Sequence, residues 1–194
     1  MRISSSLWLT ILTTVVVSSA CGAGAGERRE RIDGMREIEG IPCTDYAWYE
    51  AETGRFKGCT LAREIVVDTS RIPAGTKVDV DTDHKPVMLF LPHDTEIDGH
   101  VCRGEGHEYQ TKLHPNGRLA FCNLPLPAKI DGVPCEKSTF WTWTLVGPAG
   151  VDFHDDGSLK GCLLAEDYSL DGTTYRKGTR FQRDAAGRAI AAPH

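Results

Sequence analysis

Apolar residues along the chain occur in short runs that are separated by turn-forming residues. Residues 46–49, 87–91 and 139–146 are such runs, and their composition and alternation are typical of β-strands. Asn-Gly and Asp-Gly favour tight hairpin turns because both central residues need positive φ, and they occur at 98–99, 116–117, 131–132 and 156–157. No stretch after residue 38 offers an apolar face with helical period, so we predict an all-β fold built from hairpins. Residues 27–36 are strongly charged, and we expect one helical turn there or a continuation of a flexible N-terminal tether.

Six of the seven cysteines fall in two repeated motifs, which indicates an internal repeat. Three copies of Ile-[Asp/Glu]-Gly-x-x-Cys end at Cys43, Cys102 and Cys135. Three copies of Gly-x-[Phe/Leu]-x-x-Cys end at Cys59, Cys122 and Cys162. We therefore predict three β repeats, at 32–95, 96–128 and 129–194, of which the middle one is short.

The strongest internal similarity joins residues 54–81 to residues 157–184, which align without a gap. The identical pairs are Gly54/Gly157, Lys57/Lys160, Gly58/Gly161, Cys59/Cys162, Leu61/Leu164, Ala62/Ala165, Asp68/Asp171, Gly75/Gly178, Thr76/Thr179 and Asp81/Asp184. We expect the two segments to have the same strands at equivalent positions. We also expect Leu61 and Leu164 both to be buried.

The N-terminal segment has the three parts of an export signal: the charged Arg2, an apolar run at 7–17 and small residues at 18–20. The apolar run is too short to span a bilayer. Ser19-Ala20-Cys21 resembles the lipobox of bacterial lipoproteins, in which the cysteine is lipidated and becomes the mature N-terminus. We therefore predict a signal peptide at 1–20, lipidation of Cys21, a flexible tether at 21–31 and attachment to the cell envelope. The alternative is ordinary cleavage after Ala20, which would give a secreted protein with a spare thiol.

The formal net charge is −5, and removal of the leader takes away one arginine and no acidic residue. A mildly acidic chain argues against binding to nucleic acid, which selects for basic patches. It also argues against electrostatic docking to anionic lipid. We therefore expect any contact with the membrane to be made through the N-terminal lipid.

An even number of cysteines at repeated spacings in an exported chain predicts disulfides. The simplest connectivity joins the two cysteines of each copy, as Cys43–Cys59, Cys102–Cys122 and Cys135–Cys162. The alternative is a zinc or redox role, although the chain contains no Cys-x-x-Cys pair. We expect no cofactor and no metal.

Two further patterns contain residue types that bind metals. His93, His100, His107 and His114 recur at every seventh position, but an odd spacing alternates between the faces of a strand. We interpret them as solvated loop residues, with zinc or copper binding as the alternative. Residues 79–83 resemble the start of a calcium loop whose later ligand positions are not matched. We interpret this segment as a charged strand face that ends in a turn.

The tryptophans supply the best candidates for a ligand site. Trp141, Trp143 and Leu145 lie on one face of a predicted strand because residues 140–145 alternate. Such aromatic ladders bind sugars, whose apolar faces stack on indole rings. A Trp/Leu strand face is more often part of a packed core. We therefore favour core packing for Trp141 and Trp143, and the alternative is a ligand site with Trp141, Trp143 and Trp48 as its candidate residues.

The Gly-x-[Phe/Leu]-x-x-Cys segment after each turn resembles MORN-type repeats, which are β-hairpin units with an Asn/Asp-Gly turn. This resemblance is short and implies architecture alone. As a whole, the chain resembles a repeat-bearing bacterial lipoprotein. The sequence has no Gly-x-Ser-x-Gly, His-Glu-x-x-His or Walker-type motif, and we predict no catalytic residue. We expect a non-enzymatic module that binds a protein, glycan or cell-wall partner; the alternative is a small envelope hydrolase acting on a polysaccharide.

Overall fold

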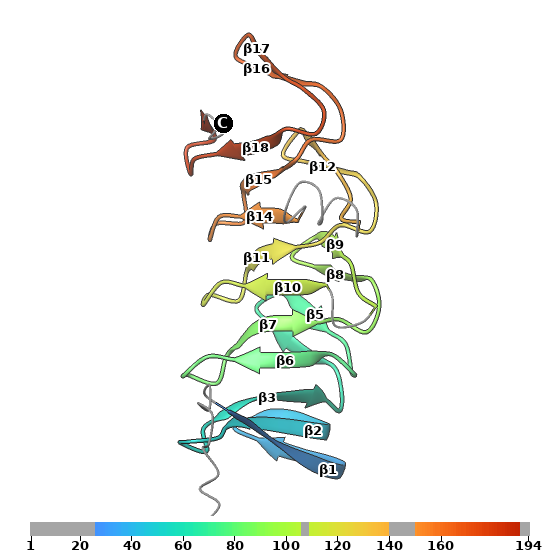
Figure 1. Cartoon of the computed structure of the whole chain (residues 1–194), viewed down its shortest axis with the longest axis vertical. Helices are drawn as coiled ribbons and strands as arrows, with labels where there is room; N and C mark the ends of the chain where they lie inside the picture. Colours follow the sequence, from blue (N-terminus) through green and yellow to red (C-terminus); the bar gives the residue numbers. More distant parts are fainter. Residues whose placement is uncertain (1–25, 106–108, 140–149, 191–194) are drawn as a thin grey trace, which may run out of the picture.

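The computed structural model describes residues 26–105, 109–139 and 150–190, and every regular element within them is a β-strand (Figure 1). Eleven strands form one sheet, called the main sheet below. They are β1 (Glu27–Ile38), β2 (Ile41–Glu50), β3 (Phe56–Leu61), β6 (Lys77–Val80), β7 (Pro86–Phe90), β10 (Gln110–Leu113), β11 (Leu119–Cys122), β14 (Val151–Phe153), β15 (Leu159–Leu163), β18 (Arg180–Arg183) and β19 (Ala189–Ile190). The predicted all-β, disulfide-stapled fold is confirmed.

The strands of the main sheet lie side by side in the order in which they occur along the chain. Each neighbouring pair is antiparallel, so the connections between consecutive strands alternate between the two ends of the strands. The sheet therefore extends in one direction from β1 to β19, and this direction is the long axis of the molecule in Figure 1.

Four two-stranded hairpins interrupt this progression at regular intervals. They consist of β4 (Ile65–Val67) with β5 (Ser70–Ile72), β8 (Thr95–Ile97) with β9 (His100–Cys102), β12 (Ala128–Ile130) with β13 (Val133–Cys135), and β16 (Tyr168–Leu170) with β17 (Thr173–Tyr175). Each hairpin turns at an aspartate with positive φ, namely Asp68, Asp98, Asp131 and Asp171. Three of these aspartates precede glycine, so the Asp-Gly signals at 98–99 and 131–132 did mark hairpin turns.

A pattern of one main-sheet strand, one hairpin and a second main-sheet strand recurs four times. We call these segments unit 1 (β3 to β6), unit 2 (β7 to β10), unit 3 (β11 to β14) and unit 4 (β15 to β18). The pair β1 and β2 precedes unit 1, and β19 follows unit 4. The cysteine motifs predicted three copies, whereas strand topology divides the described residues into four units whose boundaries fall within the main-sheet turns.

The predicted equivalence of 54–81 and 157–184 is confirmed, because these segments are units 1 and 4. The strands β4, β5 and β6 begin and end at positions that align without a gap with β16, β17 and β18. Cys59 and Cys162 occupy the same position in β3 and β15, and Leu61 and Leu164 are both buried. The repeated sequence therefore encodes one repeated backbone.

The charged segment at the N-terminal side of the described residues differs from the prediction. Residues 27–38 form β1, neither a helical turn nor a flexible tether. This strand pairs with β2 from Glu27↔Glu50 to Ile38↔Ile41. Its side chains are mostly exposed and charged, with ion pairs such as Arg36–Glu30 at 2.8 Å. A strand at the edge of a sheet tolerates such composition because one side of its backbone faces solvent.

Successive units are joined by hydrogen bonds from the hairpin turns. The carboxylate of Asp98, in the hairpin of unit 2, accepts a hydrogen bond of 3.3 Å from the backbone N–H of Leu119 at the start of unit 3. Asp131 accepts the equivalent bond, 2.7 Å long, from Leu159 at the start of unit 4. The hairpins also touch one another, since Ser70 Oγ accepts a bond of 2.8 Å from the N–H of Asp98. The aspartates of the Asp98-Gly99 and Asp131-Gly132 turns thus link unit 2 to unit 3 and unit 3 to unit 4.

The core lies between the main sheet and the hairpins. One row of main-sheet residues, one from each of eight strands, is at most 1% exposed. The row consists of Cys59, Val78, Leu89, Thr111, Cys122, Val151, Cys162 and Phe181. Its apolar members belong to one core cluster with the hairpin residues Ile72, Ile97, Ile130 and Val133. We call the opposite side of the main sheet the outer face.

Candidate functional site

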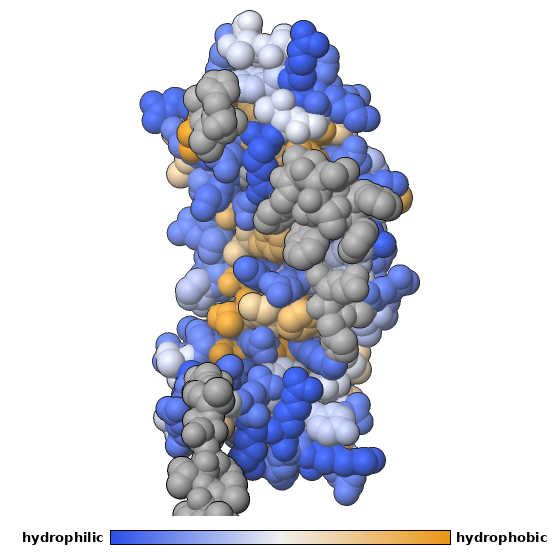
Figure 2. All heavy atoms as spheres, viewed as in Figure 1, coloured by the Kyte–Doolittle hydropathy of each residue, from blue (hydrophilic) through white to orange (hydrophobic). Residues whose placement is uncertain are grey.

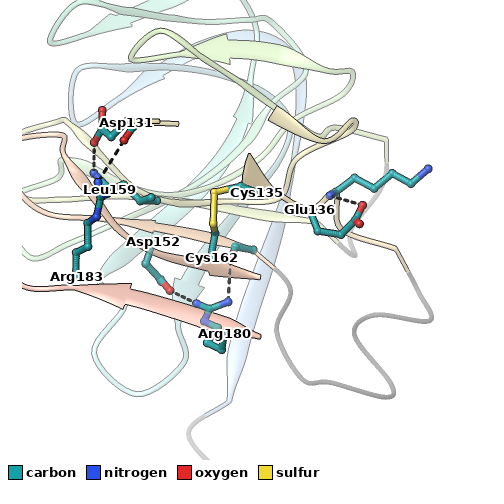
Figure 3. The surroundings of a disulfide bond; sticks show 10 residues. Asp131, Cys135, Glu136, Asp152, Leu159, Cys162, Arg180 and Arg183 are labelled. Carbon is teal, nitrogen blue, oxygen red and sulfur yellow. Dashed lines mark hydrogen bonds and ion pairs between the residues drawn. A yellow bond between two sulfur atoms is a disulfide. The ribbon is translucent and has the colours of Figure 1, made fainter. Parts of the chain in front are cut away.

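Two of the three predicted disulfides are present. Cys43 is bonded to Cys59 with the two Cα atoms 5.7 Å apart, and Cys135 is bonded to Cys162 with the Cα atoms 5.6 Å apart (Figure 3). The second bond links the hairpin of unit 3 to the first strand of unit 4. Disulfides persist in oxidising compartments, so these bonds indicate a location outside the cytoplasm.

The third predicted pair is not bonded in the structure. Cys102 and Cys122 are both free thiols and both fully buried. Burial raises the pKa of the Cys102 thiol well above its usual range, and a hydrogen bond with Cys122 raises this pKa further. The two thiols are therefore in contact.

The outer face of the main sheet carries a second row of residues in cross-strand register, which we call the outer row. From β2 to β18, each member is paired with the next across neighbouring strands. The outer row consists of Trp48, Gly58, Asp79, Met88, Lys112, Phe121, Asp152, Gly161 and Gln182. It brings together side chains from all four units.

Trp48, a predicted ligand residue, closes one end of the outer row. Its side chain covers Gly58, where an added Cβ atom would lie 2.9 Å from the indole nitrogen. The same nitrogen donates a hydrogen bond of 2.7 Å to Asp79 Oδ1. Burial raises the pKa of Asp79, and the hydrogen bond from Trp48 partly offsets this change. With 9% of its surface exposed, Trp48 packs on the sheet.

An ion pair lies near the other end of the outer row. Arg180 donates to the carboxylate of Asp152 and also to the carbonyl oxygen of Gly150, the latter at 2.9 Å (Figure 3). These bonds cross three neighbouring strands, because Asp152 lies in β14 and Arg180 in β18. Like Trp48 and Asp79, this pair stabilises the sheet.

The middle of the outer row is its most accessible part. Met88 and Phe121 are half-buried, and Lys112 between them is exposed. The ammonium of Lys112 lies 5.8 Å from the centre of the Phe121 ring, within the range of a cation–π contact. The ring lies against Gly150, where an added Cβ atom would be 2.1 Å from Phe121 Cζ. Figure 2 shows apolar atoms at the surface over β7, β10 and β11. We call Met88, Lys112 and Phe121 the central patch.

Several predicted site residues lie outside the described residues. These are Cys21, Trp141, Trp143 and His107. Their predicted roles in lipidation and ligand binding remain predictions.

Of the remaining histidines that the sequence singled out, His100 and His114 both contact Phe153. His93 lies before β8, and its Nδ1 is 3.3 Å from Thr95 Oγ1. His100 stacks on Phe153 with ring centres 4.7 Å apart, and burial lowers its pKa. His114 Nε2 is 3.1 Å from the carbonyl oxygen of Phe153. Among the described residues, no group of three or more His, Cys, Asp or Glu side chains is arranged to hold a metal ion.

The acidic segment 79–83 is divided between a strand and a turn. Asp79 lies on the outer face, and Asp81 Oδ1 accepts hydrogen bonds of 2.9 Å from the N–H groups of Asp83 and Lys85. Asp184 makes the equivalent pair of bonds in the turn after unit 4. These carboxylates stabilise turns, in keeping with the interpretation as a strand face that ends in a turn.

Comparisons with protein-family models, with curated proteins and with solved structures found no match. Among the described residues, no helix has the length and apolar character needed to cross a membrane.

Sequence reasoning did not find the central patch. Its residues come from two units, Met88 and Lys112 from unit 2 and Phe121 from unit 3, and they share no motif. They meet because the turn lengths set the register of β7, β10 and β11. The available signal was their alternation with Leu89, Thr111 and Cys122, which occupy the buried row.

Proposed function

We propose that the protein is a lipid-anchored, non-enzymatic module of the bacterial cell envelope, and that it binds an envelope partner through the outer face of its main sheet. Glycan strands are the partner class that the chemistry of the central patch favours. The observation that carries this proposal is the placement of Met88, Lys112 and Phe121 in register at the accessible middle of an otherwise internally bonded row.

The location in the envelope rests on two independent features. The disulfides Cys43–Cys59 and Cys135–Cys162 require an oxidising environment. The leader and Cys21 have the pattern of a lipidated export signal. Together these features support a mature protein held at a membrane surface by lipid and exposed outside the cytoplasm.

The preference for glycan follows from the side chains of the central patch. An aromatic ring and a thioether offer apolar surface on which the CH face of a sugar can stack. Lys112 can donate hydrogen bonds to hydroxyl or carboxyl groups of the same polymer. The neighbouring residues Gln110 and Asn123 add amide groups, one of which donates to the chain itself, from Asn123 Nδ2 to Gln110 O at 3.2 Å. A sheet face with such groups in a row suits an extended polymer.

The test is co-sedimentation of the purified exported chain with isolated cell-wall polysaccharide. Lys112→Ala with Phe121→Leu should weaken binding at least tenfold. Val66→Ser is the matched control, because Val66 is also an exposed apolar residue but lies in the hairpin of unit 1. Equal binding by both variants and the wild type would reject the central patch as the binding surface.

The hydrolase alternative requires two carboxylates that face a bound polysaccharide, in the roles of acid and base or nucleophile. The outer row contains Asp79 and Asp152, which interact with Trp48 and Arg180 respectively. Release of reducing ends from the same polysaccharide would identify an enzyme. Binding without release would support the module.

A further inference from the structure

We propose that Cys102 and Cys122 are joined by a third disulfide in the exported protein. In the structure they are buried thiols in contact. They occupy positions in the repeat that correspond to those of the bonded pair Cys135–Cys162, and the proposed disulfide is independent of the proposed binding function.

Cys102 with Cys122, and Cys135 with Cys162, each connect the second strand of one hairpin to the first strand of the next unit. Cys102 lies in β9, three residues after Gly99 of the hairpin turn, and Cys135 lies in β13, three residues after Gly132. Cys122 and Cys162 hold the same position in the buried row, one in β11 and the other in β15. The two pairs are therefore related by a shift of one unit.

The backbone beside the two pairs is also held in the same way. The N–H of Arg103, directly after Cys102, donates to the carbonyl oxygen of Asn123, directly after Cys122, at 2.6 Å. The N–H of Glu136, directly after Cys135, donates to the carbonyl oxygen of Leu163, directly after Cys162, at 2.7 Å. Because the bonded pair has this backbone arrangement, the unbonded pair can close without moving its strands.

One junction of the repeat has no cysteine. Ile72 in β5 and Leu89 in β7 stand where the other junctions have their cysteines, and both are fully buried. An apolar pair therefore fills this position without a covalent bond. The fold tolerates the unbonded state of Cys102 and Cys122 because two buried side chains can fill this junction without a covalent bond. Isoleucine and leucine are therefore the matched replacements for Cys102 and Cys122.

Formation of the Cys102–Cys122 disulfide needs an oxidant. The oxidising compartment in which the other two disulfides form provides one. The disulfide of a thiol–disulfide oxidoreductase is attacked by one cysteine as a thiolate, and the mixed disulfide is then resolved by the second cysteine. Two protons and two electrons leave the Cys102–Cys122 pair, and the oxidoreductase departs as a dithiol. Burial of both thiols in the folded chain places this exchange before the hairpin of unit 2 packs on β11.

The test is disulfide mapping of the full chain purified from an exporting host. The protein is denatured at acidic pH, treated with N-ethylmaleimide, digested without reductant and analysed by mass spectrometry. The expected result is a peptide pair linked through Cys102 and Cys122, lighter by two hydrogens than the sum of its reduced partners, with no maleimide on either cysteine. Maleimide on both residues would overturn the proposal, as would a bond from either residue to another cysteine.

Cys102→Ile with Cys122→Leu is the matched variant, since it copies the Ile72 and Leu89 junction. It should fold and retain the Cys43–Cys59 and Cys135–Cys162 peptides while losing only the third linked pair. Rearranged bonding in this variant would contradict the equivalence of the junctions on which the inference depends.

Discussion

The carboxylate of Asp131 accepts a hydrogen bond of 2.7 Å from the backbone N–H of Leu159, and this bond ties the hairpin of unit 3 to the first strand of unit 4. Leu159 is 2% exposed, so its N–H lies at the buried edge of the strand. The same relationship holds between Asp98 and Leu119 one unit earlier. The aspartate of the Asp-Gly turn therefore both forms the hairpin and positions the next repeat.

Asp131→Ala should destabilise the protein by about 2–4 kcal/mol, as the sum of two effects. Loss of the carboxylate leaves the N–H of Leu159 without its partner, which costs about 1–3 kcal/mol. Alanine also tolerates the positive φ of 47° poorly, at about 1 kcal/mol. Asp171→Ala is the control, because Asp171 has the same turn conformation with no unit after it. Chemical denaturation should give the larger loss for Asp131→Ala, and equal losses would contradict the role of the carboxylate.

The repeated units and the contacts between them explain how much of the fold the sequence predicts. The match of 54–81 with 157–184 identified units 1 and 4, because both keep the glycines and cysteines that mark their turns and junctions. Unit 2 begins with Pro86 and has Leu89 in place of the cysteine, so a count based on cysteine motifs placed its first strand, which the apolar run at 87–91 predicts, in the first copy. Strand topology identifies unit 2 because the buried row accommodates either a leucine or a cysteine at this position.

The prediction for residues 27–38 was wrong for a different reason. Its charged composition has no strand alternation, and its structure is set by pairing with β2, which no local pattern encodes. The central patch was missed because cross-strand register is a property of the whole sheet. Trp48 was proposed as a ligand residue from its residue type alone. Its indole N–H donates to Asp79, so its side chain takes part in the packing of the sheet.

Gly58→Ala should be strongly destabilising, by about 2–3 kcal/mol. An added Cβ atom would lie 2.0 Å from the carbonyl oxygen of Val78 and 2.9 Å from the indole nitrogen of Trp48, so strand and side chain must both move. Gly99→Ala is the control, since its Cβ atom would meet nothing within 4 Å and only the positive φ of 81° opposes it. Urea denaturation followed by tryptophan fluorescence measures both, and a smaller loss for Gly58→Ala would contradict the packing of Trp48.

Asp79 should make the protein less stable as pH rises from acidic values towards neutrality. Burial raises its pKa in the folded state above the ordinary value of 3.8, so the folded chain binds this proton more tightly than the unfolded chain. The favourable contribution is therefore fully present below the unfolded pKa and is lost as pH rises through the folded pKa. Asp79→Asn removes this dependence while keeping an oxygen that can accept from Trp48.

The measurement is the free energy of unfolding of wild type and Asp79→Asn across this pH range. The difference between wild type and variant should shift in favour of the variant as pH rises. A difference that is constant with pH would contradict the raised pKa of Asp79.

Cys21 should carry the lipid that anchors the protein. Metabolic labelling with a fatty-acid probe is expected to mark the wild type and not Cys21→Ala, because the predicted modification forms on this thiol. A second variant, Cys102→Ile with Cys122→Leu, keeps Cys21 and should label as the wild type does. Equal labelling of wild type and Cys21→Ala would rule out lipidation at this residue.

The central claim is that the outer face binds an envelope glycan through Met88, Lys112 and Phe121, and amide chemical-shift mapping tests it most directly. Soluble cell-wall oligosaccharide is titrated into the isotope-labelled exported chain. We predict saturable shifts centred on these three residues and their neighbours Gln110 and Asn123. Saturable shifts that instead centre on the hairpins, around exposed residues such as Val66 and Val101, would contradict the claim, as would a complete absence of shifts.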